Sequence, residues 1–184
     1  GPEHPDTATS FNNLGVLLRA MGDLLVARPY YERALAIFER VLGPEHPDTA
    51  SSLNNLGVLV DSLGDPAGAR PYLERALAIR ELIIGPEHPD TASSLNNLGT
   101  LLRTSGDLAR AQPYLERALA IRERVLGAEH PDTASSLNNL GHLLYSMGDL
   151  AGARPHYERA LAIREHVLGC LLYTSDAADE RSSV

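Results

Sequence analysis

The sequence repeats itself with a period of 42 residues, and this period constrains the fold more than any other feature. The octet Gly-Pro-Glu-His-Pro-Asp-Thr-Ala starts at Gly1 and returns at Gly43, Gly85 and Gly127, with Ala128 replacing Pro in the last copy. Most positions recur because every copy solves the same packing problem. We therefore divide the chain into repeats 1 to 4 and a tail, with the boundaries 1–42, 43–84, 85–126, 127–168 and 169–184.

Each repeat contains two apolar patterns with the spacing of an α-helix. The first pattern of repeat 1 has apolar residues at i, i+3, i+7 and i+10, namely Phe11, Leu14, Leu18 and Met21. The second pattern runs from Ala27 to Val41, and Gly22-Asp23 lies in the short turn between the two. Connections this short force neighbouring helices to be antiparallel. The sequence therefore predicts an all-α chain of four helix–turn–helix repeats.

The residues between the apolar patterns mark the expected helix ends. Asp23 suits the N-cap of the second helix, because its carboxylate can accept a free N–H of the first turn. This helix should stop at Leu42, since Gly43 can adopt the left-handed C′ conformation and Pro44 cannot continue a helix. The next first helix should start around His46-Pro47-Asp48, with Pro at N1 and Asp complementing the helix dipole.

A proline recurs about six residues into each second pattern, as Pro29, Pro71, Pro113 and Pro155. Inside a helix it removes one backbone hydrogen bond and favours a kink. Its presence in every copy indicates a built-in bend of the second helix. The alternative interpretation is that the second helix starts later.

These residues match the tetratricopeptide pattern W-x2-L-G-x2-Y followed by A-x3-F. In repeat 1 the pattern reads Phe11, Leu14, Gly15 and Leu18, then Ala27 and Tyr31. Such repeats usually have 34 residues. The longer period here, with segments such as His88-Pro89-Asp90 and Leu95-Asn96-Asn97-Leu98, resembles the kinesin light chain subtype. The resemblance implies a right-handed α-solenoid whose first helices line a concave groove that holds peptides.

Comparison of the four copies separates scaffold positions from candidate binding positions. On the first helix, Asn12, Val16 and Arg19 share one face at i, i+4 and i+7, away from the apolar stripe. We therefore expect this row to face the groove. The candidate peptide-binding residues are Asn12, Val16, Arg19, Asn54, Val58, Asp61, Asn96, Thr100, Arg103, Asn138, His142 and Tyr145.

An identical amide in each repeat could donate to and accept from a peptide backbone of any sequence. The varying positions would then set the preference: Arg19 and Arg103 for acidic side chains, and His142 with Tyr145 for flat contact area. The alternative is that the asparagines only bond to neighbouring helices. A second set of asparagines points elsewhere on the helix, and we expect it to be structural: Asn13, Asn55, Asn97 and Asn139.

Charge and residue types argue against catalysis and against several classes of partner. The net charge of −8 argues against nucleic acid or an anionic membrane as the main partner, and no apolar run is long enough to span a membrane. The octet histidines should lie a repeat apart, on the order of 10 Å, so we interpret them as loop or capping residues rather than metal ligands. With one Cys and no phosphate-binding Gly-rich loop, we expect no cofactor, no metal and no enzyme.

The tail departs abruptly from the repeat. The string from Cys170 to Glu180 resembles a translated sequencing-library adapter, and we expect residues 169–184 to be non-native or disordered. The chain also starts inside a repeat rather than at a Met, and we interpret it as a fragment of a longer array. An open array end exposes apolar surface, which predicts marginal stability or self-association through the uncapped repeat ends.

The main functional hypothesis is a scaffold that binds a protein or peptide in the concave groove. The alternative hypothesis is a regulatory or autoinhibitory segment of a larger signalling ATPase or protease, whose catalytic domain lies outside this sequence. All 16 basic residues are Arg, which is typical of a GC-rich genome and favours a bacterial origin. No secretory signal is visible, and we expect a cytoplasmic protein.

Overall fold

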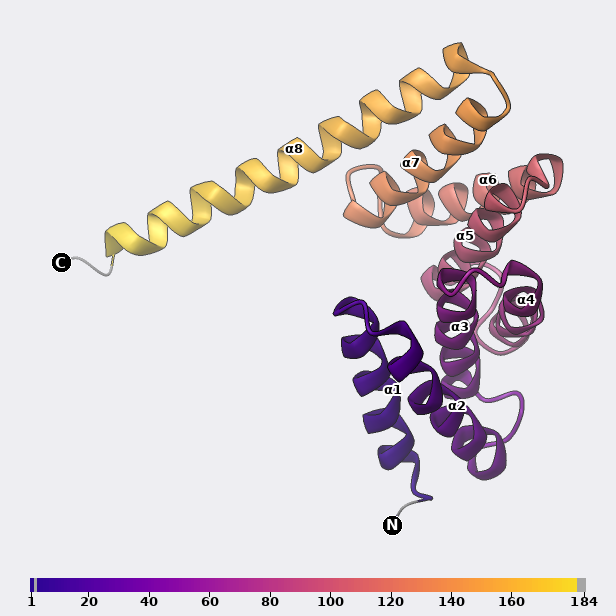
Figure 1. The fold of residues 1–184 in the computed structure, drawn as a ribbon. Coiled ribbons are helices and arrows are strands. Elements are labelled where there is room, and N and C mark those ends of the chain that lie inside the picture. The colour runs from indigo at the N-terminus through magenta and orange to yellow at the C-terminus, as the bar shows by residue number, and fades with distance from the viewer. Residues whose placement is uncertain (2, 182–184) are drawn as a thin grey trace.

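The computed structural model describes residues 1 and 3–181, with side chains described as far as Val167. This part of the chain is an α-solenoid of eight helices (Figure 1). The first helices of the four repeats are α1 (Pro5–Ala20), α3 (Pro47–Ser62), α5 (Pro89–Thr104) and α7 (Pro131–Ser146). The second helices are α2 (Leu24–Val41), α4 (Pro66–Ile83), α6 (Leu108–Val125) and α8 (Leu150–Arg181).

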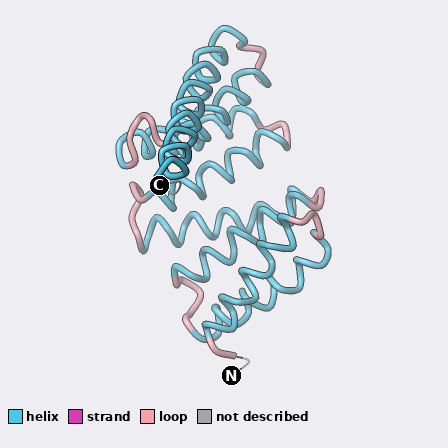
Figure 2. The backbone as a smooth tube through the Cα atoms, turned by 90° about the vertical axis from the view of Figure 1, so that its left-hand side faces the viewer, coloured by secondary structure: helices cyan, strands magenta, loops and turns pink. Residues whose placement is uncertain are grey.

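Each repeat forms one antiparallel helix pair, and the pairs stack in chain order. The closest packing lies within a pair, and the next closest joins the second helix of one repeat to the first helix of the following repeat. Short loops make every connection between helices (Figure 2). We call the three contacts between repeats junction 1 (α2 with α3), junction 2 (α4 with α5) and junction 3 (α6 with α7). The predicted all-α repeat architecture is thus confirmed.

The first helices begin where the sequence predicts. Pro47 occupies the first turn of α3, and His46 is its N-cap, with the imidazole Nδ1 accepting a hydrogen bond from the Asp48 N–H at 3.1 Å. The same cap recurs on α1, α5 and α7. At the other end of the repeat, α2 stops at Val41 and Gly43 adopts a φ of +99°. A residue with a Cβ rarely adopts this conformation, so glycine permits the turn. The predicted capping role of the octet histidines is confirmed.

The N-cap prediction for the second helices is confirmed in only two repeats. Asp65 accepts a hydrogen bond from the Gly68 N–H at 2.8 Å, whereas Asp23 makes no side-chain cap bond among the described residues. A Cβ built on Gly68 would lie 2.3 Å from Asp65 Oδ2. Repeat 1 has Val26 at this position, so a carboxylate placed like that of Asp65 would clash with its Cβ. The same contrast separates Asp149, which caps Gly152, from Asp107.

The repeated proline lies inside each second helix. The helix α2 starts at Leu24, five residues before Pro29, so the interpretation that the helix starts after the proline is wrong. Pro29 leaves the carbonyl of Leu25 without its helical N–H donor. Both residues are exposed, which allows water to bond to that carbonyl. The bend expected from the proline stays a prediction.

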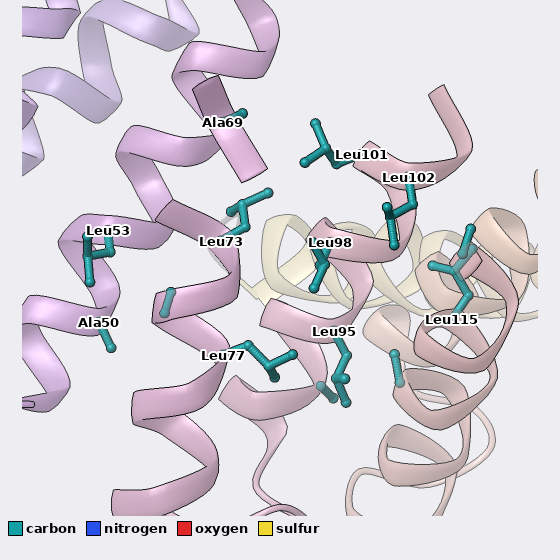
Figure 3. Close-up of a cluster of buried hydrophobic side chains, with 14 of the residues drawn as sticks. Ala50, Leu53, Ala69, Leu73, Leu77, Leu95, Leu98, Leu101, Leu102 and Leu115 are labelled. Atoms are coloured by element: carbon teal, nitrogen blue, oxygen red, sulfur yellow. The ribbon is translucent and has the colours of Figure 1, made fainter. Parts of the chain in front are cut away.

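The core is one continuous apolar cluster that extends from Ala27 in repeat 1 to Ile163 in repeat 4. Figure 3 shows part of it around junction 2, with leucines of α4 such as Leu73 and Leu77 and leucines of α5 such as Leu95 and Leu98. Within repeat 1, a Cβ on Gly15 would lie 2.8 Å from Tyr31 Cε1. Glycine at this position therefore permits the close approach of α1 and α2. None of the described helices is both long and apolar enough to cross a bilayer.

A buried arginine joins the repeats at junctions 2 and 3. Arg80 Nη1 donates to the Asp90 carbonyl oxygen at 2.9 Å and to Ser94 Oγ at 2.8 Å. Burial lowers the pKa of the Arg80 guanidinium, and the Asp90 carboxylate acts in the opposite sense. At junction 3, Arg122 makes the same two contacts with Asp132 and Ser136.

Junction 1 has a different residue at this position. The equivalent of Arg80 there is Phe38, which is buried in a small separate cluster with Ile37 and two alanines. The serine that would meet the arginine is Ser52, and its fully buried hydroxyl has no hydrogen-bond partner within the described residues.

Ion pairs on the outer surface also connect neighbouring second helices. Arg75 Nη1 lies 2.5 Å from Glu39 Oε1 across junction 1, and the same pairing joins Arg117 to Glu81 across junction 2. Arg159 pairs with Glu123 across junction 3. Each repeat thus contacts its predecessor at both a buried layer and an exposed layer.

The last helix is longer than its counterparts. Whereas α2 ends at Val41, α8 continues past the equivalent position to Arg181. Side chains from 168 onwards and residues 182–184 lie outside the described part of the chain. The prediction that residues 169–184 are non-native or disordered stays a prediction.

Candidate functional site

The first helices form the inner side of the solenoid. The backbones of consecutive first helices approach one another closely, α1 with α3, α3 with α5 and α5 with α7, whereas consecutive second helices in the described part of the chain are joined only through long side chains such as the Arg75–Glu39 pair. In Figure 1, α1, α3, α5 and α7 follow the inner side of the arc and the second helices follow its outer side. We call the surface of the first helices on this side the inner face.

The predicted binding row is accessible in every repeat. All four asparagines of the row, Asn12, Asn54, Asn96 and Asn138, are half-buried. The varying positions are exposed in repeats 1 and 4, where Tyr145 has 63% of its surface accessible, and are half-buried in repeats 2 and 3. By contrast, the apolar stripe of α3 is buried, as at Leu53 and Leu56. The row therefore lies at the accessible edge of the core, which Val58 still contacts.

The two sets of asparagines bond to each other across the junctions. Asn55 Nδ2 donates to Asn12 Oδ1 at 3.2 Å, and Asn97 Nδ2 donates to Asn54 Oδ1 at 2.9 Å. The third such bond joins Asn139 to Asn96 at 3.0 Å. The structural role expected of the second asparagine is thus confirmed in repeats 2 to 4.

These bonds also define what the first asparagine can still do. Its carbonyl oxygen accepts from the following repeat, so Asn12, Asn54 and Asn96 do bond to neighbouring helices. The Nδ2 groups of these three side chains make no hydrogen bond within the described residues. An amide carries two N–H donors. Repeats 1 to 3 therefore each present one amide group without a hydrogen-bond acceptor among the described residues, held in place by the next repeat.

The charged positions of the row alternate in sign along the inner face, from Arg19 through Asp61 to Arg103. Burial raises the pKa of the Asp61 carboxyl above its ordinary value. In repeat 1, burial likewise raises the pKa of Tyr31, and the nearby Arg19 guanidinium opposes that rise. The Arg19 guanidinium therefore influences Tyr31, although the buried Tyr31 hydroxyl has no hydrogen-bond partner among the described residues.

Aromatic side chains gather at the repeat 4 end of the row. The Tyr157 hydroxyl lies 2.9 Å from His142 Nδ1, and the two rings meet edge to face with centroids 5.3 Å apart. Burial raises the pKa of Tyr157; Arg103 lowers it and Tyr145 raises it further. We call His142, Tyr145, Tyr157 and Arg103 the aromatic–arginine cluster. It combines flat contact area with a cation, which suits a carboxylate beside an apolar group.

Tyr157 was absent from the residues predicted from the sequence. It lies on α8, outside the first helices that carry the predicted row. The available signal is that this position differs between copies, with Tyr31 and Tyr157 in the outer repeats and Leu73 and Leu115 in the middle ones. A tyrosine hydroxyl at a packing position needs a polar hydrogen-bond partner. This need indicates that the side chain reaches toward the polar inner face.

The described hollows of the surface lie away from the predicted row. One of these hollows is formed mainly by α6 and has a volume of about 420 Å³. It is lined by Leu95, Ala109, Arg110, Pro113, Tyr114 and Arg117. None of these belongs to the row. Among the described residues, no group of three or more His, Cys, Asp or Glu side chains could hold a metal ion.

Comparisons with known proteins agree with the architecture. The sequence profile of the tetratricopeptide repeat matches residues 6–82, 62–124 and 90–166. The crystal structure of BtubC (BKLC) from P. vanneervenii is similar with a TM-score of 0.79 and 32% identity, covering 90% of this chain and 66% of that one. Two structures of a kinesin light chain-like protein with nearly identical TPR-like repeats, from Podosopora anserina, have TM-scores of 0.74 and 0.71. Each is 27% identical over 91% of this chain and 79% of the other. No curated protein matches the sequence.

Proposed function

The chain belongs to the tetratricopeptide repeat family, and on that basis we propose that it binds an extended peptide segment of another protein along its inner face. The observation that supports this most directly is the row itself. Two of its three positions differ between copies while most of each first helix repeats, and the row remains accessible on the inner side of the arc.

The asparagines would supply contacts that do not depend on peptide sequence. One amide donor group per repeat recurs on the order of 10 Å apart. An extended peptide rises roughly 3.3 Å per residue, so about every third backbone carbonyl would meet an asparagine. Because the asparagine carbonyls already accept from the next repeat, each donor group is oriented before the peptide arrives, which reduces the entropy lost on binding.

The varying positions would set the direction and the preference of the peptide. Arg103, in the aromatic–arginine cluster, fits an acidic side chain next to an apolar or aromatic one. Asp61, one repeat earlier, favours a basic side chain and disfavours an acidic one. The predicted ligand therefore carries a basic residue roughly three positions from an acidic residue.

A peptide-display selection against the 184-residue chain tests this proposal, followed by affinity measurements on the enriched peptides. We expect enrichment of acidic and aromatic residues. Arg103→Glu should weaken binding by at least tenfold, because it replaces a charge-assisted hydrogen bond by repulsion. Arg110→Glu is the matched control, since it makes the same charge change in the same repeat on an exposed residue of α6. It should change affinity by less than about twofold.

Equal affinity of the enriched peptides for Arg103→Glu and the wild type would contradict the proposal. The asparagines are less suitable for this test. Asn54→Ala removes the acceptor of Asn97 as well as a candidate peptide donor, so a loss of binding would have two explanations.

A further inference from the structure

Repeat 2 departs from the other copies near the end of its second helix. The position is basic in three copies, as Arg40, Arg124 and His166, whereas repeat 2 has Leu82 there. Leu82 is 68% exposed, and the adjacent Ile83 is 47% exposed. A single exposed leucine is common on protein surfaces. Here two large apolar side chains are exposed together in the one copy that has lost the basic residue, and the packing of the array does not require them.

The arginine of the other copies pairs with the glutamate of the octet. Arg124 forms an ion pair with Glu87 in repeat 3, and Arg40 forms one with Glu3 in repeat 1. The corresponding glutamate of repeat 2 is Glu45, which is exposed and forms no ion pair among the described residues. Repeat 2 therefore keeps the carboxylate of this pair and lacks the guanidinium.

A second guanidinium lies near Glu45 but is bound elsewhere. Arg75 Nη1 lies 2.5 Å from Glu39 Oε1, and its Nη2 donates to the Pro44 carbonyl oxygen at 3.3 Å. In repeat 3 the equivalent Arg117 makes the same two contacts while another arginine pairs with the glutamate of the octet. This surface of a repeat thus accommodates two guanidinium groups, and repeat 2 supplies only one of them.

Two hollows adjoin at Glu45. One has a volume of about 430 Å³ and lies between the loop that precedes α3 and the side chain of Ile83. The other has a volume of about 280 Å³, and its lining includes Ile79 and Leu82. Pro44 and Glu45 line both hollows. An exposed carboxylate therefore lies between two partly apolar hollows, an arrangement that suits a cation on an aliphatic stem.

We propose that this surface, the Glu45 site (Pro44, Glu45, Ile79, Leu82 and Ile83), binds an arginine side chain of another protein together with an apolar side chain near it. The other copies identify the occupant, since an arginine pairs with this glutamate in repeats 1 and 3. A guanidinium fits better than an ammonium because it can bind both carboxylate oxygens at once. The net charge of −8 also favours the approach of a basic partner.

The Glu45 site goes beyond peptide binding at the inner face. It lies on α4 and on the loop before α3, and none of its residues belongs to the row. A segment bound there leaves the inner face free. Arg103→Glu tests only the inner face and should not change binding at the Glu45 site, so failure of either proposal can be distinguished from failure of the other.

A subtractive peptide-display selection with the 184-residue chain tests the proposal. Peptides are selected on the wild type and depleted on Leu82→Arg, which gives repeat 2 the ion pair of repeats 1 and 3 and so occupies Glu45 from within the chain. The recovered peptides should share an arginine with an apolar residue near it, and Leu82→Arg should weaken their binding at least tenfold. Leu25→Arg is the matched control, because it makes the same change at a leucine of α2 that is 77% exposed. It should change affinity by less than about twofold.

A second pair of variants tests the carboxylate without changing the apolar side chains. Glu45→Gln keeps the shape of the side chain and removes its charge, so it should weaken the recovered peptides roughly tenfold. Glu87→Gln makes the same change at a carboxylate that Arg124 already occupies, and it should change affinity by less than about twofold. Both glutamates are exposed, so neither substitution disturbs the core.

Three outcomes of the selection would overturn the proposal: no peptide that distinguishes the wild type from Leu82→Arg, recovered peptides without arginine, or equal losses for Glu45→Gln and Glu87→Gln. Sedimentation velocity of the wild type tests whether a second copy occupies the site instead. Self-association that Leu82→Arg abolishes would assign the surface to that second copy and would also overturn the proposal.

Discussion

Junction 1 and junction 2 connect repeats of nearly the same sequence by different means. At junction 2 a guanidinium fills the space between helices and bonds to a serine hydroxyl and a backbone carbonyl. At junction 1 Phe38 stands at the equivalent position, buried in a cluster with residues of its own repeat, and the hydroxyl of Ser52 has no hydrogen-bond partner among the described residues. The same stacking of helices therefore tolerates either an apolar or a charged side chain at this position.

The difference shows which part of the junction is essential. Both junctions bury leucines at equivalent positions, such as Leu56 at junction 1 and Leu98 at junction 2. The polar layer is not shared. Burial disfavours the charge of Arg80, as its lowered pKa indicates, and the hydrogen bonds offset that penalty. We infer that apolar burial holds the repeats together and that the arginine layer adds a smaller amount.

The largest effect is expected when the space at junction 2 is emptied. Arg80→Ala removes the filling side chain and leaves Ser94 as poorly bonded as Ser52, and should lower the free energy of unfolding by roughly 2–3 kcal/mol. Denaturant unfolding at low protein concentration measures the total loss, and amide hydrogen exchange of α4 and α5 localises it. Arg164→Ala is the control, with a change within about 0.5 kcal/mol for an exposed residue. Similar losses for both variants would contradict the role of burial.

A smaller effect is expected when the buried arginine of junction 2 is replaced by phenylalanine, the residue at the equivalent position of junction 1. Arg80→Phe should lower the free energy of unfolding by only about 1 kcal/mol, because an apolar side chain of similar volume often replaces a buried charge at little loss. Arg122→Phe at junction 3 repeats the test and should give the same result. If the phenylalanine variants lose as much as Arg80→Ala in the same unfolding experiment, then hydrogen bonds rather than filling determine the stability of this layer.

The smallest effect concerns the serines and should differ in sign between the junctions. Ser94→Ala removes a bonded hydroxyl and should reduce stability by about 1 kcal/mol. Ser52→Ala removes an unpaired buried hydroxyl and should be neutral or stabilise by up to about 1 kcal/mol. The midpoints of denaturant unfolding compare the two directly. A loss on Ser52→Ala equal to that on Ser94→Ala would mean that the Ser52 hydroxyl has a bonding partner.

Much of the fold could be predicted because its determinants are local and repeated. The period fixes the number of helix pairs, and His46, Pro47 and Gly43 act within a few residues of the helix ends they define. The apolar spacing of the first helix likewise separates the buried stripe from the inner face. In each case the interaction partners lie a few residues apart, so the spacing in the sequence is sufficient.

The contacts between repeats could not be predicted in the same way. The partner of Asn55 is Asn12, in the preceding repeat, and that of Arg80 is Ser94, in the following one. Which polar atoms meet depends on the angle at which one repeat packs on the next, and the apolar pattern does not specify that angle. The missing caps correlate with a more local feature: the capping residues Asp65 and Asp149 precede a glycine by three residues, whereas Asp23 precedes Val26.

The glycines that end the helices are spaced evenly along the whole array. Those with positive φ are separated by 21 residues each, alternately after a first and after a second helix, from Gly22 to Gly148. A gain or loss of one full period therefore leaves every turn in register. Recombination between nearly identical copies of the coding sequence would change the length of the array without breaking a junction. Loss of residues 43–84, for example, would place Phe38 against Ser94, a pairing equivalent to the one that junction 1 already contains.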